Sequence, residues 1–116
     1  MNNPHRDDRL IQHMLQYCNE INASHAEFDA SKDVFLARPS YRNAVALCVL
    51  QIGELSNQLS EDFKKTHSHM PWQQMRGLRN IVAHQYGMID FDSLWITSTE
   101  DIVQLRAFCE EYLSQS

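Results

Sequence analysis

The stretch from Ser40 to Leu59, SYRNAVALCVLQIGELSNQL, is the most informative about the fold of this chain. Its apolar residues recur at intervals of three and four, which is the spacing of one face of an α-helix and not the alternation of a β-strand. The residues on this face are Tyr41, Ala44, Val45, Leu47, Cys48, Ile52, Leu55 and Leu59. Because the apolar face is broad, we predict that this helix lies at the centre of a helical bundle.

Two further helices are predicted before this stretch. Apolar residues trace one stripe from about Asp7 to Ala26, which indicates a long amphipathic helix with a polar outer face. A short connecting helix is predicted from Ser31 to Ala37. Ser31 is a favourable N-cap for it, and a helix usually ends at or before the residue that precedes a proline, here Pro39.

A loop and another helix are predicted after the central stretch. The loop covers residues 67–71, HSHMP. Pro71 is predicted as the first residue of the next helix, because its missing N–H costs nothing at that position. This helix extends to about Gln85, and Gly87 follows where a glycine commonly closes a helix.

The last helical segment begins at an N-cap provided by Asp90 or Asp92 and continues to about Leu113. We expect a break near Thr97–Asp101, where Ser98 would cap a second segment. The chain has only three glycines and three prolines, which leaves little material for hairpins. The predicted fold is therefore all-α, an up-and-down bundle of four main helices joined by short loops.

The composition indicates one water-soluble domain spanning residues 1–116. The chain is 43% hydrophobic and 22% charged, with a mean hydropathy of −0.47. No apolar stretch approaches the ~20 residues that cross a bilayer, and the N-terminus lacks a secretory signal pattern, so we expect a cytoplasmic protein without membrane contact. The cysteines Cys18, Cys48 and Cys109 fall in apolar stretches, which predicts reduced, buried thiols and no metal site.

The net charge of −5 argues against broad electrostatic attraction to nucleic acid, so any RNA contact must be local. Positive charge is concentrated at Arg42, Lys64, Lys65, Arg76 and Arg79, which allows a basic cleft on an acidic body. Among these residues, Arg76, Lys64 and Lys65 are candidates for contacts with backbone phosphates. A charged helix end explains the two lysines equally well.

The stretch with the most chemical information is residues 76–86, RGLRNIVAHQY. On a helix, Asn80 and His84 share a face because they are four residues apart, whereas Arg79 lies about 140° around the axis from His84. The long side chain of Arg79 must therefore curl toward the face of His84. Asn80 is placed to hydrogen-bond one ring nitrogen and orient the imidazole.

A guanidinium beside an imidazole supplies what metal-free cleavage of a phosphodiester requires. Arg79 would bind the phosphate through two hydrogen bonds and stabilise the charge that develops on its oxygens. His84, which titrates near neutral pH, would move protons to or from the reacting oxygens. One Arg and one His are too few for complete acid–base catalysis, so we expect a symmetric dimer that brings two copies together.

The arrangement from Arg79 to His84, with Tyr86 two residues later, resembles the signature of the HEPN ribonuclease superfamily in its HepT-like branch. The resemblance extends over nearly the whole chain. It includes Asp8-Arg9-Leu10, Ile52-Gly53-Glu54, Leu59-Ser60 with Phe63, Pro71-Trp72, and the stretch from Asp90 to Trp95.

The resemblance implies a homodimeric helical bundle that cleaves RNA, not DNA, without a metal ion or other cofactor. It also implies that the chain is the toxin of a HepT/MntA (type VII-like) toxin–antitoxin pair. In such pairs the partner is a small nucleotidyltransferase antitoxin, MntA, which transfers AMP to the motif tyrosine, here Tyr86. The added phosphate and adenosine would pair with Arg79 and block the cleft.

Two other interpretations stay open at this stage. The chain would look nearly the same if it were a non-catalytic subunit that holds nucleotide or RNA beside a nucleotidyltransferase. A helical dimerisation module that has lost activity is the third interpretation. The sequence leaves the role of Glu54 undecided, and it favours a plain loop for His67 and His69, which lack a third metal ligand.

Overall fold

The computed structural model describes the backbone over residues 4–85 and 90–115, and side chains over residues 5–78 and 90–115. This part of the chain contains helices and no strand, so the all-α prediction is confirmed. The elements are α1 (Pro4–Glu27), α2 (Lys32–Ala37), α3 (Pro39–Gln58), α4 (Glu61–Thr66), α5 (Trp72–Gln85), α6 (Phe91–Ile96), the π-helical turn η2 (Thr97–Asp101) and α7 (Ile102–Ser114).

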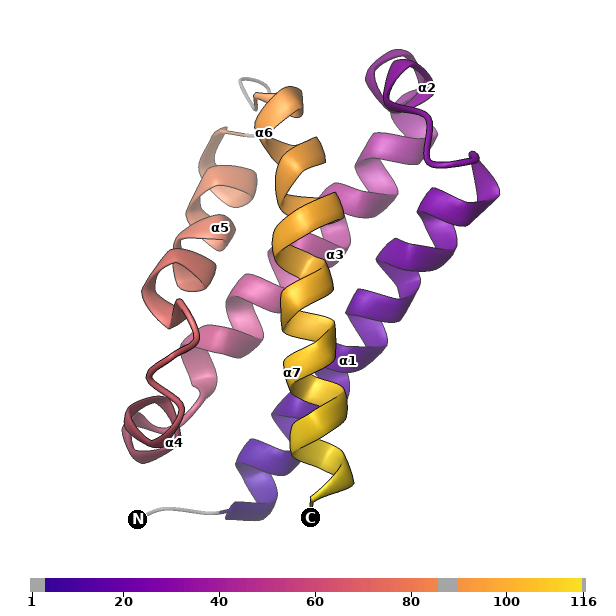
Figure 1. Ribbon diagram of the computed structural model, residues 1–116. Helices are drawn as coiled ribbons and strands as arrows, with labels where there is room; N and C mark the ends of the chain where they lie inside the picture. Colours follow the sequence, from indigo (N-terminus) through magenta and orange to yellow (C-terminus); the bar gives the residue numbers. More distant parts are fainter. Residues whose placement is uncertain (1–3, 86–89, 116) are drawn as a thin grey trace.

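The four long helical segments run alternately up and down, as predicted (Figure 1). α3 packs against both α1 and α5, and α1 also packs against α7. α7 also packs against α5, because the Phe108 ring lies 5.5 Å from that of Trp72, so the four helices close into a bundle. The short helices α2 and α4 lie at opposite ends of α3 (Figure 1).

The core confirms the central role of α3. Tyr41, Val45 and Ile52 have no exposed surface, and they meet buried residues of α1 and α7, among them Met14 and Leu105. Each fully buried aliphatic side chain of this kind stabilises the fold by about 1.5–3 kcal/mol.

Two residues of the predicted apolar face, Ala44 and Leu47, are exposed and do not reach this core. Leu47 is 56% exposed, although its spacing along α3 matches that of the buried residues. The neighbouring helices cover only part of the circumference of α3, and the helical period cannot show which part.

The predicted caps of the short helices are confirmed. The Ser31 hydroxyl accepts a hydrogen bond from the Val34 N–H at 3.3 Å. The Asp90 carboxylate caps α6 by accepting from the N–H groups of Asp92 and Ser93 at 3.0 and 3.3 Å.

The start of α5 differs by one residue from its prediction. The helix begins at Trp72, and the Pro71 carbonyl accepts from the Met75 N–H at 3.0 Å, so Pro71 is the cap and not the first helical residue. The predicted closing residue of this helix, Gly87, lies outside the described residues.

The helix α4 was not predicted as a separate element. The Ser60 hydroxyl caps it by accepting from the Phe63 N–H at 3.1 Å. The buried Asp7 carboxylate accepts from the N–H of Ser60 at 3.0 Å and from its hydroxyl at 2.7 Å. These bonds join the first turn of α1 to the start of α4, so they determine where the cations of α4 lie.

The α-helix is interrupted at residues 97–101, as predicted, but the predicted cap is wrong. The interruption is the π-helical turn η2 between α6 and α7, and Ser98 is buried and caps no helix. Its hydroxyl donates to the Trp95 carbonyl at 3.1 Å and lies 3.0 Å from Nε2 of His25. The π-helical turn carries the extra residue that turns Ser98 toward the core.

Cys18, Cys48 and Cys109 are buried and form no disulfide, as predicted. In the described ranges, no helix is long and apolar enough to cross a bilayer.

Candidate functional site

The motif residues Arg79, Asn80 and His84 belong to the second half of α5, whose backbone is helical through Gln85. Their side chains, and the whole of Tyr86, lie outside the described residues. What is described is the helix that carries them. Five residues of α-helix separate positions 79 and 84 by about 7.5 Å along the axis and about 140° around it.

The first half of α5 is anchored in the core by Trp72 and Met75, which are 6% and 7% exposed. The Trp72 indole N–H donates to the His67 carbonyl at 2.9 Å, and its ring packs against Phe63 and Phe108, with centroids 5.9 and 5.5 Å away. Trp72 is therefore a core anchor. This anchor sets the direction of the helix on which the motif lies.

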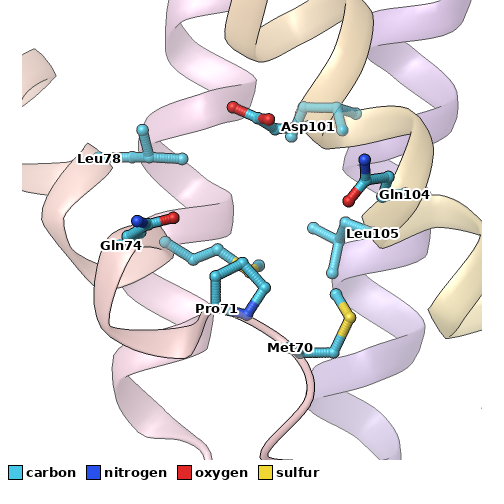
Figure 2. A pocket seen from close by; sticks show the side chains of 9 residues that line it. Met70, Pro71, Gln74, Leu78, Asp101, Gln104 and Leu105 are labelled. Carbon is cyan, nitrogen blue, oxygen red and sulfur yellow. The ribbon is translucent and has the colours of Figure 1, made fainter.

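One flank of α5 faces η2 and α7 across a small pocket of about 70 Å³. Figure 2 shows Gln74 and Leu78 on one wall, and Asp101 and Gln104 on the other. The pocket has room for about two water molecules and is too small for a nucleotide. Position 79 lies four residues after Met75, which lines the pocket, so this flank is nearer to position 79 than to position 80. Because of its small size, we do not assign the pocket as the substrate site.

The other flank of α5 borders a larger hollow of about 240 Å³, here called the basic hollow. Its lining residues are Ser56 of α3, Glu61 and Lys64 of α4, and Trp72, Gln73 and Arg76 of α5. Positions 76, 80 and 84 follow one another at four-residue intervals, so they lie on nearly the same side of α5. The basic hollow therefore continues the side of the helix that carries positions 80 and 84.

The structure brings together two of the three residues predicted to contact RNA. Lys64 and Arg76 both line the basic hollow, whereas Lys65 is exposed and does not line it. Lys64 is held by Glu61, with Nζ 3.0 Å from Oε1. In the described part of the chain, Arg76 forms no ion pair. Glu61 and Gln73 were not predicted to lie at the site, although the spacing of Glu61 and Lys64 is that of a helical ion pair.

Arg42 is not part of this cluster. It lies 14 residues before Ser56 on α3, which is about 21 Å along the helix. Its guanidinium donates to the Leu36 carbonyl at 2.9 Å and stacks over the Phe91 ring at 4.7 Å. The cations that are concentrated in the sequence are therefore divided between two ends of α3.

One of the two loop histidines, His67, packs against aromatic side chains of the core. The His67 ring packs against Phe63 and Phe108, with centroids 4.5 and 5.3 Å away. Burial, and then the neighbouring His69, lower the pKa of His67. Among the described residues, no group of three or more His, Cys, Asp or Glu side chains is arranged to hold a metal ion. Glu54, whose role the sequence left undecided, is half-buried on α3.

Comparison with known proteins finds a ribonuclease family and several of its relatives. The sequence model of the family described as "Ribonuclease HepT-like" matches residues 11–112. "Putative RNase MJ1380" of Methanocaldococcus jannaschii is 31% identical over 97 residues, which cover 84% of this chain and 87% of that protein. "Probable ribonuclease HepT" of Thermococcus cleftensis is 35% identical over 77 residues, 66% of this chain and 70% of that protein. No solved structure matches.

Proposed function

The chain belongs to the HepT-like ribonuclease family, and from this membership we propose that it is a dimeric endoribonuclease that cleaves RNA without a metal ion. The observation that carries the proposal is the position of Arg79, Asn80 and His84 on one continuous helix, α5. The anchored first half of α5 supports it, because a fixed helix holds catalytic groups in one geometry.

The proposed reaction uses the 2'-hydroxyl of the RNA as the nucleophile. Its oxygen attacks the adjacent phosphorus while its proton passes to a base, and the bond to the 5' oxygen breaks as that oxygen receives a proton. The strand is left with a cyclic phosphate end. Arg79 binds the phosphate oxygens, and His84 transfers a proton while Asn80 orients its ring.

We propose that two chains form the working enzyme. One imidazole cannot be both base and acid within a single displacement, and a symmetric dimer supplies a second His84 beside the first. Specific activity should therefore fall when the protein is diluted until sedimentation shows monomers. Undiminished activity of the monomer would show that one chain carries a complete site.

We propose that the chain acts as a toxin restrained by a nucleotidyltransferase antitoxin. The phenolic oxygen of Tyr86 attacks the α-phosphorus of ATP, pyrophosphate leaves, and AMP remains on the tyrosine. Tyr86 follows His84 by two residues, so the new phosphate lies within reach of Arg79 and competes with the substrate for it.

The nuclease proposal is tested with labelled RNA and purified protein in excess chelator. Arg79→Ala should slow cleavage by roughly 100- to 1000-fold, and His84→Ala by roughly 100-fold or more. Arg9→Ala and His13→Ala are matched controls, because both residues are exposed on α1. Their activity should equal that of the wild type.

Three results of this experiment would contradict the proposal. Full activity of either motif variant would exclude that residue from catalysis. Loss of activity in chelator, restored by a divalent cation, would exclude the metal-free mechanism. RNA binding without cleavage by the wild type would favour the non-catalytic subunit.

A further inference from the structure

The basic hollow is built from three helices that meet beside α5. Ser56 comes from α3, Lys64 from α4, and Gln73 and Arg76 from α5. The Ser56 hydroxyl donates to the Ile52 carbonyl at 2.8 Å, so Ser56 forms part of the wall. The buried indole of Trp72 closes the inner side. The polar groups that face the hollow are thus mainly those of α4 and α5.

The position of Lys64 is determined by the packing of α4. Phe63, the preceding residue, is buried, and the bonds from Ser60 to Asp7 hold the start of the helix. The Lys64 side chain is only 16% exposed, and Glu61 contacts its ammonium group. An ammonium group has three N–H donors, so Lys64 keeps donors for a second anion.

Arg76 faces the same hollow from α5. Its guanidinium has five N–H donors in a planar fork, a geometry that matches two oxygens of a phosphate. No carboxylate of the described chain forms an ion pair with it. The hollow holds two cations against the one carboxylate of Glu61, on a protein with a net charge of −5.

We propose that the basic hollow is a phosphate-binding subsite for the RNA strand, which holds a backbone phosphate other than the one that is cut. This inference rests on the proposed function, because it takes RNA as the ligand. Position 76 lies eight residues before position 84, about 12 Å along α5. A strand whose reacting phosphate is at the motif therefore follows α5 toward the hollow.

Such a subsite has two measurable properties. It contacts the phosphate and not the base, so it strengthens the binding of different RNA sequences by the same factor. Each phosphate contact on a single strand also contributes about 0.7 to the slope of log affinity against log salt concentration. Lys64 and Arg76 hold the same phosphate, so their contributions are coupled.

The test measures binding of two unrelated 2'-O-methyl RNA oligonucleotides, which this mechanism cannot cleave because the nucleophile is blocked. Arg76→Gln and Lys64→Gln should each weaken the binding of both oligonucleotides about fivefold. The factor by which the double variant loses affinity should be clearly smaller than the product of the two single factors. The slope of its log affinity against log salt concentration should be smaller in magnitude by about 0.7. Arg76→Lys should keep most of the affinity.

Arg106→Gln is the matched control, since it removes the same charge from α7, where Arg106 pairs with Glu110 and donates to Asn19 of α1. It should bind like the wild type, and thermal melting should show that every variant is folded. An equal loss in Arg106→Gln, independent losses in the double variant, or wild-type binding by both hollow variants would each overturn the subsite. Inorganic phosphate at millimolar concentration should weaken wild-type binding more than that of the double variant.

This test is independent of cleavage. If the wild type cleaves RNA and the hollow variants bind normally, the subsite is wrong and the nuclease proposal stands. If the hollow variants bind weakly as predicted but the wild type cleaves no RNA, the subsite stands and the nuclease proposal fails.

Discussion

Nε2 of His25 lies 3.0 Å from the hydroxyl oxygen of Ser98, across 73 residues of sequence. The other ring nitrogen, Nδ1, contacts the Tyr41 hydroxyl, and Ser98 donates to the Trp95 carbonyl at 3.1 Å. One assignment of protons satisfies all four groups. Tyr41 donates to Nδ1, the Nε2–H donates to Ser98, and Ser98 donates to the carbonyl. This assignment requires a neutral imidazole.

The first prediction is that acid destabilises the fold through His25. Burial lowers the pKa of His25, so the unfolded chain binds its proton at a higher pH than the folded chain does. The stabilisation from neutral His25 is fully present above its pKa in the unfolded chain, about 6.5. It is lost as the pH falls through the pKa of His25 in the folded protein. The free energy of unfolding should decrease by up to about 1.4 kcal/mol per pH unit in this window.

The contribution of His25 to this pH dependence is a difference between two slopes. Each slope is that of unfolding free energy against pH, one for the wild type and one for His25→Gln. His67 also has a lowered pKa and adds to the total slope in both proteins. His13→Gln is the matched control, because His13 is exposed on α1. Urea unfolding at several pH values measures the slopes, and equal slopes in the wild type and His25→Gln would contradict the prediction.

The second prediction concerns Ser98. Ser98→Ala removes the group that accepts from the imidazole of His25 and donates to the Trp95 carbonyl, and water cannot easily replace it in the core. Thermal or urea unfolding should show a loss of about 1–3 kcal/mol. Ser114→Ala, at an exposed helix end, should change stability by less than about 0.5 kcal/mol.

The third prediction concerns the link between Asp7 and Ser60. Asp7→Ala leaves the N–H and hydroxyl of Ser60 without their acceptor and should cost about 2–3 kcal/mol of unfolding free energy. Asp33→Ala, at an exposed position of α2, is the control. Hydrogen exchange should become faster in α4 of the Asp7 variant, and unchanged protection there would show that the link does not hold the helix.

The fourth prediction is that the three thiols are unreactive in the folded protein. Burial raises the pKa of Cys109 to about 12 and that of Cys48 to about 11, and it also raises the pKa of Cys18. The reactive thiolate is therefore scarce at pH 8. Iodoacetamide should label none of the thiols in the native protein within an hour and all three in denaturant, as counted by intact mass.

The fifth prediction concerns Tyr86, the proposed site of AMP transfer by the antitoxin. Tyr86→Phe removes the oxygen that would receive AMP but keeps the ring, so the variant should retain ribonuclease activity and escape the partner. Intact mass after incubation with a nucleotidyltransferase partner and ATP should show AMP on the wild type and on Tyr17→Phe, and none on Tyr86→Phe. Tyr17→Phe is the matched control, and AMP that persists on the Tyr86 variant would indicate another acceptor.

Local sequence patterns were enough to predict the long helices and the caps of α2 and α6. The three-and-four spacing around Tyr41 and Ile52 is a local property of the chain, as are the capping side chains of Ser31 and Asp90. Local hydrogen bonds and helical periodicity involve residues only a few positions apart, so both can be recognised in the sequence. The spacing of Arg79 and His84 was readable for the same reason, and their catalytic roles stay predictions.

The packing of the helices determines which side chains meet. Leu47 matches the apolar pattern of α3, yet it is exposed because no neighbouring helix covers it. The bonds from Asp7 to Ser60, and the meeting of Lys64 with Arg76, join residues that are distant in the chain. Such pairs depend on which helix faces lie together, and this choice is made by the packing of the whole core and not by any local stretch.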